Sequence, residues 1–334
     1  MPQQRIKSFD SLKGLMMFLV VLGHLFMFSF GSKPLPVFVK IFTAFHVPVF
    51  FFVAGMFFSI DKRQTIADKS LFLLKKAIYL IVPTLFFYAL YYYSHNLNPL
   101  AAISEGFGFY WFLPTLFMCM LFLGAINMVI ETIYSEKVEV YIVSFLMLCS
   151  IVMSIKGDFL SEFRLHKFFN YLPFFSLGYL FKKRNATGSN ILSSQFLIAL
   201  SILAGFLAIF IPRYVMPDSV RVAHIISVYA FTYLVISFFF RYQQAFDKGN
   251  IINRFFVLVG RYTLPIYVLH YFFMPDLTWL RDIMGDNSTT LVLIILVVTA
   301  IAIIGLCLLF TKIISISDFL GHYLLGQKSE KYKI

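Results

Sequence analysis

The stretch DSLKGLMMFLVVLGHLF, residues Asp10 to Phe26, has the apolar character of a membrane span, yet it contains an acid, a lysine and a histidine. A helix needs about 20 mainly apolar residues to cross the hydrocarbon core, and this run continues to Phe30. Ionisable side chains are costly inside a span, so they are retained mainly where they serve a function. These three side chains therefore guide the search for a functional site.

The composition of the whole chain excludes an ordinary soluble domain. Of the 334 residues, 60% are apolar and 13% are charged, whereas a soluble domain has about 25% charged residues. We predict an all-α fold, a polytopic membrane helix bundle of about ten transmembrane helices forming one integral-membrane domain over 1–334. The spans are expected at about 11–30, 37–59, 74–93, 110–133, 138–155, 168–181, 191–211, 220–240, 252–274 and 289–314.

The basic residues indicate how the chain crosses the membrane. The net charge is +12, but the 28 Lys and Arg residues form short clusters between apolar runs, which argues against a nucleic-acid partner. Most of them lie on one side if the N-terminus is cytoplasmic, so we expect both termini in the cytoplasm. The predicted location is a bacterial inner membrane or its equivalent. The three cysteines lie in apolar segments and indicate neither a disulfide framework nor a zinc site.

Lys13 and His24 share one face of the first predicted helix. Eleven positions at 100° per residue fall within about 20° of three full turns, and they separate the two residues by about 16 Å. Asp10 lies one turn before Lys13 and can pair with it. Lys13 is either a snorkelling anchor or a functional cation, and His24 is either a structural contact to another helix or a general base.

Further candidates lie along the chain. His46 is expected at a depth close to that of His24, as part of a polar cavity or of a structural contact. Lys75 and Lys76 either form part of a basic cytoplasmic mouth or are ordinary positive-inside lysines. Trp111 is an interfacial belt residue or a sugar platform, and His270 is an interfacial residue or a weak site candidate. No nucleotide-binding glycine loop and no G-x-S-x-G motif occurs.

Together these segments resemble the integral-membrane acyltransferase family 3. The resemblance covers most of the chain and is carried by Lys13 and His24 in "RIKSFDSLKGLMMFLVVLGHLF", by "FHVPVFFFVAGMFFS", by the basic pair before "LIVP", and by "YWFLPTLF", "YLPFFSLGYLF" and "GRYTLPIYVLH". The chain is most similar to stand-alone sugar O-acetyltransferases such as fucose O-acetylases. Lys75-Lys76 stands where the family often has an R-x-x-R-like pair, and Ala54-Gly55 stands where it usually has Ser-Gly.

The resemblance implies an acyltransferase that moves an acetyl group from cytoplasmic acetyl-CoA to a hydroxyl of a surface glycan or lipid-linked sugar. His24 is then the catalytic base and Asp10 orients Lys13, which meets the CoA with Lys75 and Lys76. His46, Trp111 and His270 are assigned to the acceptor or the cavity. Direct transfer and an acyl-histidine intermediate both stay open. No metal is expected. The competing hypothesis is a transporter or flippase for a polysaccharide precursor, because a polar cavity within a membrane also serves translocation.

Overall fold

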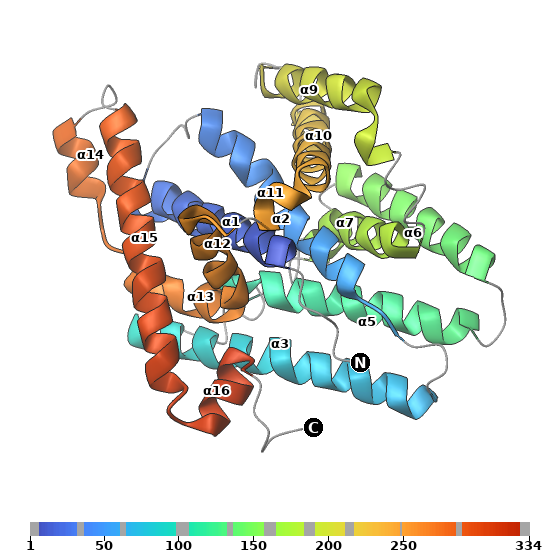
Figure 1. Cartoon of the computed structure of the whole chain (residues 1–334), viewed down its shortest axis with the longest axis horizontal. Helices are drawn as coiled ribbons and strands as arrows, with labels where there is room; N and C mark the ends of the chain where they lie inside the picture. The colour runs from blue at the N-terminus through green and yellow to red at the C-terminus, as the bar shows by residue number, and fades with distance from the viewer. Residues whose placement is uncertain are drawn as a thin grey trace. The chain divides into compact units, whose positions relative to one another are not determined.

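The structure, a computed structural model, is built from helices (Figure 1). It describes residues 7–31, 37–60, 65–97, 107–131, 136–156, 165–183, 191–210, 217–247, 249–284 and 289–327, and no strand occurs in these ranges. The principal helices are α1 (Lys7–His24), α2 (Val37–Phe57), α3 (Ile66–Ser94), α5 (Phe112–Glu131), α6 (Glu136–Lys156), α7 (Leu165–Lys183), α9 (Gln195–Phe210), α10 (Pro217–Arg241), α12 (Ile251–Arg261), α13 (Thr263–Leu269) and α15 (Thr289–Ile314). The short helices are α11 (Gln243–Asp247), α14 (Thr278–Met284) and α16 (Asp318–Leu325). The predicted all-α class is confirmed.

Helices make up most of the described residues in all ten predicted spans, but these helices differ in their ability to cross a membrane. Within the described ranges seven helices are long and apolar enough, and an eighth span results if α12 and α13 are taken together. Helix α9 has 16 residues, about 24 Å, which is short of the hydrocarbon thickness. Helix α7 carries His166 and Lys167 near its start and Lys182 and Lys183 at its end. The apolar part between them is too short to cross the hydrocarbon core. The protein is therefore a multi-pass membrane protein.

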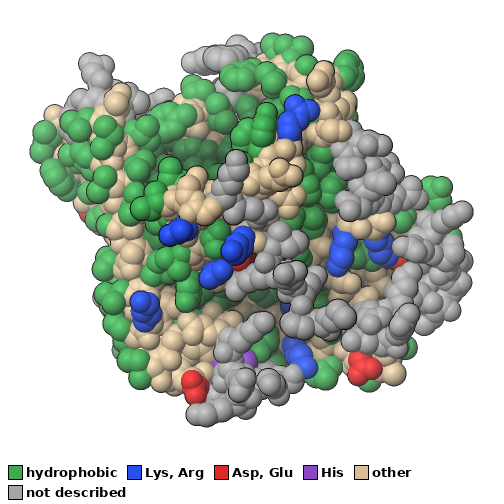
Figure 2. Space-filling view, in the orientation of Figure 1, with side chains coloured by type: hydrophobic (Ala, Val, Ile, Leu, Met, Phe, Trp, Pro, Cys, Tyr) green, Lys and Arg blue, Asp and Glu red, His purple; other side chains and the backbone are tan. Residues whose placement is uncertain are grey.

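The apolar side chains on the outside of these helices fit a lipid environment. Helix α15 exposes a series of large apolar residues, namely Leu291, Ile294, Val298, Ile301, Leu306, Leu309, Phe310 and Ile313. In Figure 2 apolar side chains cover much of the upper part of the face, and most of the Lys and Arg side chains lie across its middle and lower parts. In water such a surface would be unfavourable, whereas in a bilayer it contacts lipid tails of equal polarity.

The chain forms two compact units. The first contains Met1–Phe50 and Ile191–Ile316, and the second contains Phe51–Asn190 and Ser317–Ile334. The boundary falls inside α2, so this helix contributes to both units. The C-terminal helix α16 belongs to the second unit, although α15, which precedes it, belongs to the first.

In the first unit, two glycines allow the backbones of α1 and α12 to touch (Figure 1). A Cβ atom on Gly14 would lie 1.8 Å from the carbonyl oxygen of Phe256, and one on Gly260 would lie 1.7 Å from that of Asp10. Only glycine fits at either position, because the obstacle is backbone and cannot rotate away. Small residues are the usual means by which membrane helices approach closely.

The second unit contains the same kind of crossing between α2 and α7. A Cβ atom on Gly55 would lie 2.0 Å from the carbonyl oxygen of Phe175, and one on Gly178 would lie 1.9 Å from that of Phe52. The glycine of the Ala54-Gly55 pair therefore serves helix packing.

A sharp bend separates α12 from α13, where the sequence predicts one continuous span over 252–274. The two helices meet at 71°, and Tyr262 between them leaves the helical region with φ −111° and ψ 26°. Pro265 explains the break, because it has no N–H to donate to the carbonyl of Arg261 and its ring crowds that carbonyl. The bend turns the following segment, including the 3₁₀ turn His270–Phe273, in a new direction.

A buried polar cluster joins α5, α6 and α7 in the second unit. The Glu139 carboxylate, 1% exposed, accepts hydrogen bonds from Asn127 Nδ2 at 2.9 Å and from the Tyr179 hydroxyl. Lys183 Nζ lies 2.5 Å from its other oxygen. Since a carboxylate buried in a membrane protein needs a counter-charge and donors, these contacts hold the three helices in register.

Helix α16 docks on α3 within the same unit. His322 is buried, and its Nε2 lies 2.8 Å from the Tyr79 hydroxyl while its Nδ1 lies 2.9 Å from the carbonyl oxygen of Gln327. A carbonyl can only accept, so the Nδ1 carries the hydrogen, and the Tyr79 hydroxyl donates to the Nε2 of the neutral ring. This bond fixes the C-terminal helix to α3.

Candidate functional site

Helix α1 holds the three ionisable residues that the sequence singles out. The α-helix is continuous from Lys7 to His24, so Lys13 and His24 lie on one face, about three turns apart. Directly after His24 the hydrogen-bond pattern changes to a π-helix over Leu25–Ser29. Single π-turns within membrane helices occur frequently at functional sites. The change redirects the side chains that follow His24.

Asp10 lies between two cations of the first unit. Its Oδ1 is 2.8 Å from Lys13 Nζ, as the spacing predicts, and its Oδ2 is 4.0 Å from Arg261 Nε. Asp10 is buried, whereas the Arg261 side chain is 46% exposed. The neighbouring Gly260 permits this approach, because it lets the α12 backbone reach the Asp10 carbonyl. Two cations from different helices therefore lie beside one buried carboxylate.

From the sequence, Arg261 is only one of the many basic residues on the predicted cytoplasmic side. Its position beside Asp10 depends on the contact between α1 and α12, which joins residues about 250 positions apart in the chain. The sequence signal that points to it is Gly260, the small residue directly before the cation. A glycine followed by a basic residue is too common to identify a site by itself.

His24 forms a hydrogen bond with His270, a residue that the sequence offers only as a weak candidate. The Nδ1 of His24 lies 2.9 Å from the Nε2 of His270, and the two rings are nearly parallel, with 12° between their planes. The Tyr271 ring also stacks on the His24 ring, with 5.2 Å between the two ring centroids. His24 is half-buried, whereas His270 is fully buried. The bend at Tyr262 carries α13 and the following turn to this position.

The geometry fixes which nitrogen of His24 carries a hydrogen. The Nδ1 of His270 lies 2.9 Å from the carbonyl oxygen of Ile266, and a carbonyl only accepts, so this Nδ1 must donate. In the uncharged pair the Nε2 of His270 then has a lone pair and accepts the hydrogen bond from His24 Nδ1–H. The Nε2 of His24 is consequently without a hydrogen. In this tautomer the Nε2 of His24 has a lone pair that can accept a hydrogen bond or a proton.

His46 lies in the same unit as His24. It is 8% exposed, and its Nδ1 donates to the carbonyl oxygen of Phe42 at 2.7 Å. Because its Nδ1 carries the hydrogen, the neutral His46 ring also has its lone pair on Nε2. Helix α2 continues through Pro48, two residues after His46. The structure thus brings His24, His46 and His270 into one unit.

The remaining candidates, Lys75, Lys76 and Trp111, belong to the second unit. Lys75 and Lys76 are half-buried on α3, and Lys76 Nζ lies 5.2 Å from the centre of the Phe72 ring. The Trp111 ring stacks on Tyr171 at 5.2 Å and has Lys167 Nζ 3.8 Å from its centre. A sugar could stack on Trp111 only where these two contacts leave its ring free.

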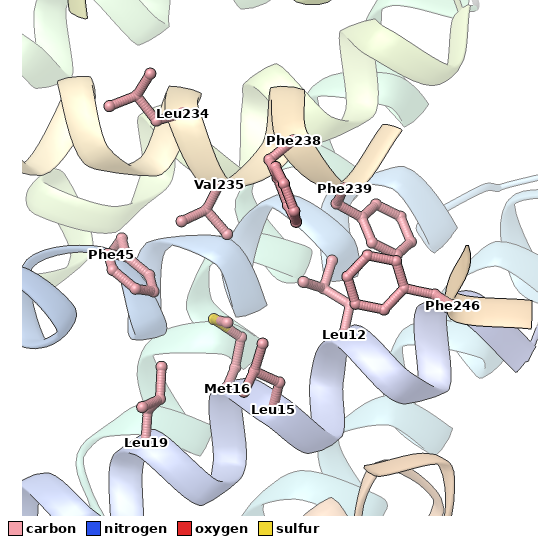
Figure 3. Close-up of a pocket in the computed structure, with 10 residues that line it drawn as sticks. All are labelled: Leu12, Leu15, Met16, Leu19, Phe45, Leu234, Val235, Phe238, Phe239 and Phe246. Carbon is pink, nitrogen blue, oxygen red and sulfur yellow. The ribbon is translucent and has the colours of Figure 1, made fainter. Parts of the chain in front are cut away.

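A cavity of about 310 Å³ lies on a different face of α1 (Figure 3). Its lining is wholly apolar and consists of Leu12, Leu15, Met16, Leu19, Phe45, Leu234, Val235, Phe238, Phe239 and Phe246. The four α1 residues form a helical stripe roughly 120° around the axis from Lys13 and His24. The cavity therefore offers no polar group to a thioester or a sugar, and we do not assign the reaction to it. Among the described residues, no three metal-ligating side chains come together.

Comparison with protein families identifies the chain. The family described as acyltransferase domain matches residues 6–312, which is far more than half of the 334 residues. The chain belongs to acyltransferase family 3. Comparison with curated proteins and with solved structures gives no significant match. The resemblance read from the sequence motifs is thus confirmed at the level of the family.

In this membrane acyltransferase, the matched residues include the hydrogen-bonded pair His24 and His270 and the ion pair of Asp10 with Lys13. The C-terminal helix α16, at Asp318–Leu325, lies beyond them. The contact between His322 and Tyr79 therefore joins a segment outside the family's domain to a helix within it.

Proposed function

We propose that this acyltransferase transfers an acetyl group from acetyl-CoA to a hydroxyl of a surface glycan or lipid-linked sugar, with His24 as the general base. The observation that carries the proposal is the bare Nε2 of His24, which follows from the hydrogen-bonded chain His24, His270 and the Ile266 carbonyl. The choice of a sugar acceptor rests on the predicted resemblance of the sequence motifs to fucose O-acetylases. The proposed location is the inner membrane.

The reaction needs a base because a sugar hydroxyl is a poor nucleophile. The Nε2 of His24 takes the hydroxyl proton while the oxygen attacks the thioester carbonyl, so that a C–O bond forms and the C–S bond breaks. The resulting imidazolium then gives the proton to the CoA sulfur. The products are the O-acetyl sugar and free CoA, and no further reactant is required.

The cations of the first unit suit the donor. Lys13 and Arg261 flank Asp10, and both carry a charge that can meet the phosphates of CoA. Lys13 is about 16 Å from His24 along α1, which leaves room for an extended pantetheine arm between phosphate and thioester. Lys75 and Lys76 stay predicted donor contacts, and His46 with its bare Nε2 stays a predicted acceptor contact.

The test is an acetyl-transfer assay with the purified full chain in detergent micelles. Acetyl-CoA and a fucose-containing oligosaccharide are supplied. Released CoA is measured as free thiol, and mass spectrometry of the oligosaccharide detects the mass of one added acetyl group. His24→Ala is expected to lose transfer at unchanged abundance. His224→Ala is the matched control, because His224 is an exposed histidine on α10.

Full acetyl transfer by His24→Ala would refute the role of His24. Movement of a glycan across vesicles without loss of thioester, by the unchanged protein, would favour the transporter hypothesis.

A further inference from the structure

The fully buried His270 is connected to His24 on one side and to the protein backbone on the other. Its Nε2 lies 2.9 Å from His24 Nδ1, and its Nδ1 lies 2.9 Å from the Ile266 carbonyl oxygen. Its side chain is 0% exposed, whereas His24 is half-buried. His270 therefore has no face left for an acceptor sugar. Its contacts point to an action on His24.

We propose that His270 is a positioning residue that selects the tautomer of His24 and holds its ring for proton transfer. This inference rests on the proposed function, because it assigns a task to the partner of the proposed base. The backbone carbonyl fixes the hydrogen on His270 Nδ1, this leaves the Nε2 as an acceptor, and the acceptor fixes the hydrogen on His24 Nδ1. In the uncharged pair the proton-accepting nitrogen of His24 is therefore its Nε2.

The tautomer matters because a free neutral histidine prefers to carry its hydrogen on Nε2. In that form His24 would present a donor to the substrate hydroxyl and could not remove its proton. The bond to His270 reverses the preference. When His24 has accepted a proton, its Nδ1–H still donates to His270 Nε2, and a bond from a charged donor is stronger than one from a neutral donor. His270 thus also stabilises the imidazolium formed during the reaction.

The local fold holds His270 in place. It is the first residue of the 3₁₀ turn that follows α13, and its carbonyl partner Ile266 lies one turn earlier and is fully buried. The Tyr271 ring lies 4.0 Å from the His270 centroid and 5.2 Å from that of His24. A ring held by a backbone bond and by packing loses little orientation on substrate binding. A residue that is hydrogen-bonded to one ring nitrogen of a histidine determines the tautomer and the orientation of that ring.

The direct test is the tautomer itself, measured by ¹⁵N NMR on histidine-labelled full chain in detergent micelles without substrate. Ring nitrogens with and without a hydrogen are well separated in ¹⁵N chemical shift. The His24 signals are assigned by their absence from the His24→Gln spectrum. We expect His24 to carry its hydrogen on Nδ1 in the unchanged protein and to change to the Nε2–H form in His270→Leu. A hydrogen on His24 Nε2 in the unchanged protein would overturn the inference.

The kinetic test compares two replacements of His270. In His270→Leu the acceptor is lost, and kcat/KM is expected to fall about 100-fold while the KM for acetyl-CoA changes less than about twofold. In His270→Gln the amide oxygen can accept from His24, so the fall is expected to stay within about tenfold. His224→Leu serves as the matched control. The double variant His24→Ala with His270→Leu is expected to be no worse than His24→Ala, because both act through one base.

The outcomes separate the two proposals. If His24→Ala is inactive while His270→Leu transfers acetyl at the rate of the unchanged protein, His270 is not a positioning residue and the proposed function stands. If His24→Ala transfers acetyl at full rate, the proposed base is wrong, and the role given to His270 is overturned with it.

Discussion

The contact between α1 and α12 should be sensitive to a single methyl group on Gly260. A Cβ atom at this position would lie 1.7 Å from the Asp10 carbonyl oxygen, whereas ordinary contact begins at 3.4 Å. The Cβ is fixed to the α12 backbone and the carbonyl belongs to the α1 backbone, so Gly260→Ala can be accommodated only if the two helices separate locally by the difference, about 1.7 Å. The Arg261 contact to Asp10, already 4.0 Å, would be lost with it.

The expected cost follows from two opposing effects. Forcing extra volume into a close helix crossing costs about 3 kcal/mol, the upper end of the usual range, because no side chain can yield. Replacing glycine by alanine within a helix returns about 1 kcal/mol. The net loss of unfolding free energy is then about 2 kcal/mol. Gly14→Ala, whose Cβ would lie 1.8 Å from the Phe256 carbonyl oxygen, should behave in the same way.

Reversible unfolding in mixed micelles, with an increasing share of denaturing detergent, measures this difference. Gly305→Ala on α15 is the control, because a Cβ atom there has no neighbour within 4 Å. It should be stabilised by about 1 kcal/mol through helix propensity. The two variants are thus expected to differ by about 3 kcal/mol. If Gly260→Ala proves as stable as Gly305→Ala, the close backbone contact of α1 and α12 does not exist.

Two further predictions concern the second unit. Glu139→Ala should lower the unfolding free energy by about 3 kcal/mol, because it leaves Lys183 without its counter-charge; the same unfolding measurement should show less than about 0.5 kcal/mol for the exposed control Asp282→Asn, and equal effects would contradict a structural role for the cluster. Tyr79→Phe removes the 2.8 Å bond to His322, so amide hydrogen exchange across α16, followed by mass spectrometry, should quicken about fivefold. Unchanged exchange would mean that this bond does not hold α16.

The parts of the fold that depend on local sequence could be predicted. Runs of apolar residues identify membrane helices because the bilayer demands a minimum length of apolar chain, and most described residues of the ten predicted segments are helical. The limits of this reasoning appear at 252–274, which is predicted as one span but bends by 71° at Tyr262. A hydropathy profile does not record that Pro265 lacks an N–H. The bend arises because the helical hydrogen bond from residue 265 to the Arg261 carbonyl cannot form.

The sequence by itself determined that this is an α-helical membrane protein, that Lys13 and His24 share a face of α1, and that Asp10 pairs with Lys13. The first follows from the length of the apolar runs, and the other two follow from the 3.6-residue period, which acts over a few turns of one helix. Only the tertiary structure decided that His270 joins His24 and that Arg261 joins Asp10. Both contacts link the first helix to a segment about 250 residues later, and they form because Gly14 and Gly260 allow two backbones to touch and Pro265 turns the chain beyond them. Such contacts depend on the packing of distant helices, which no local period encodes.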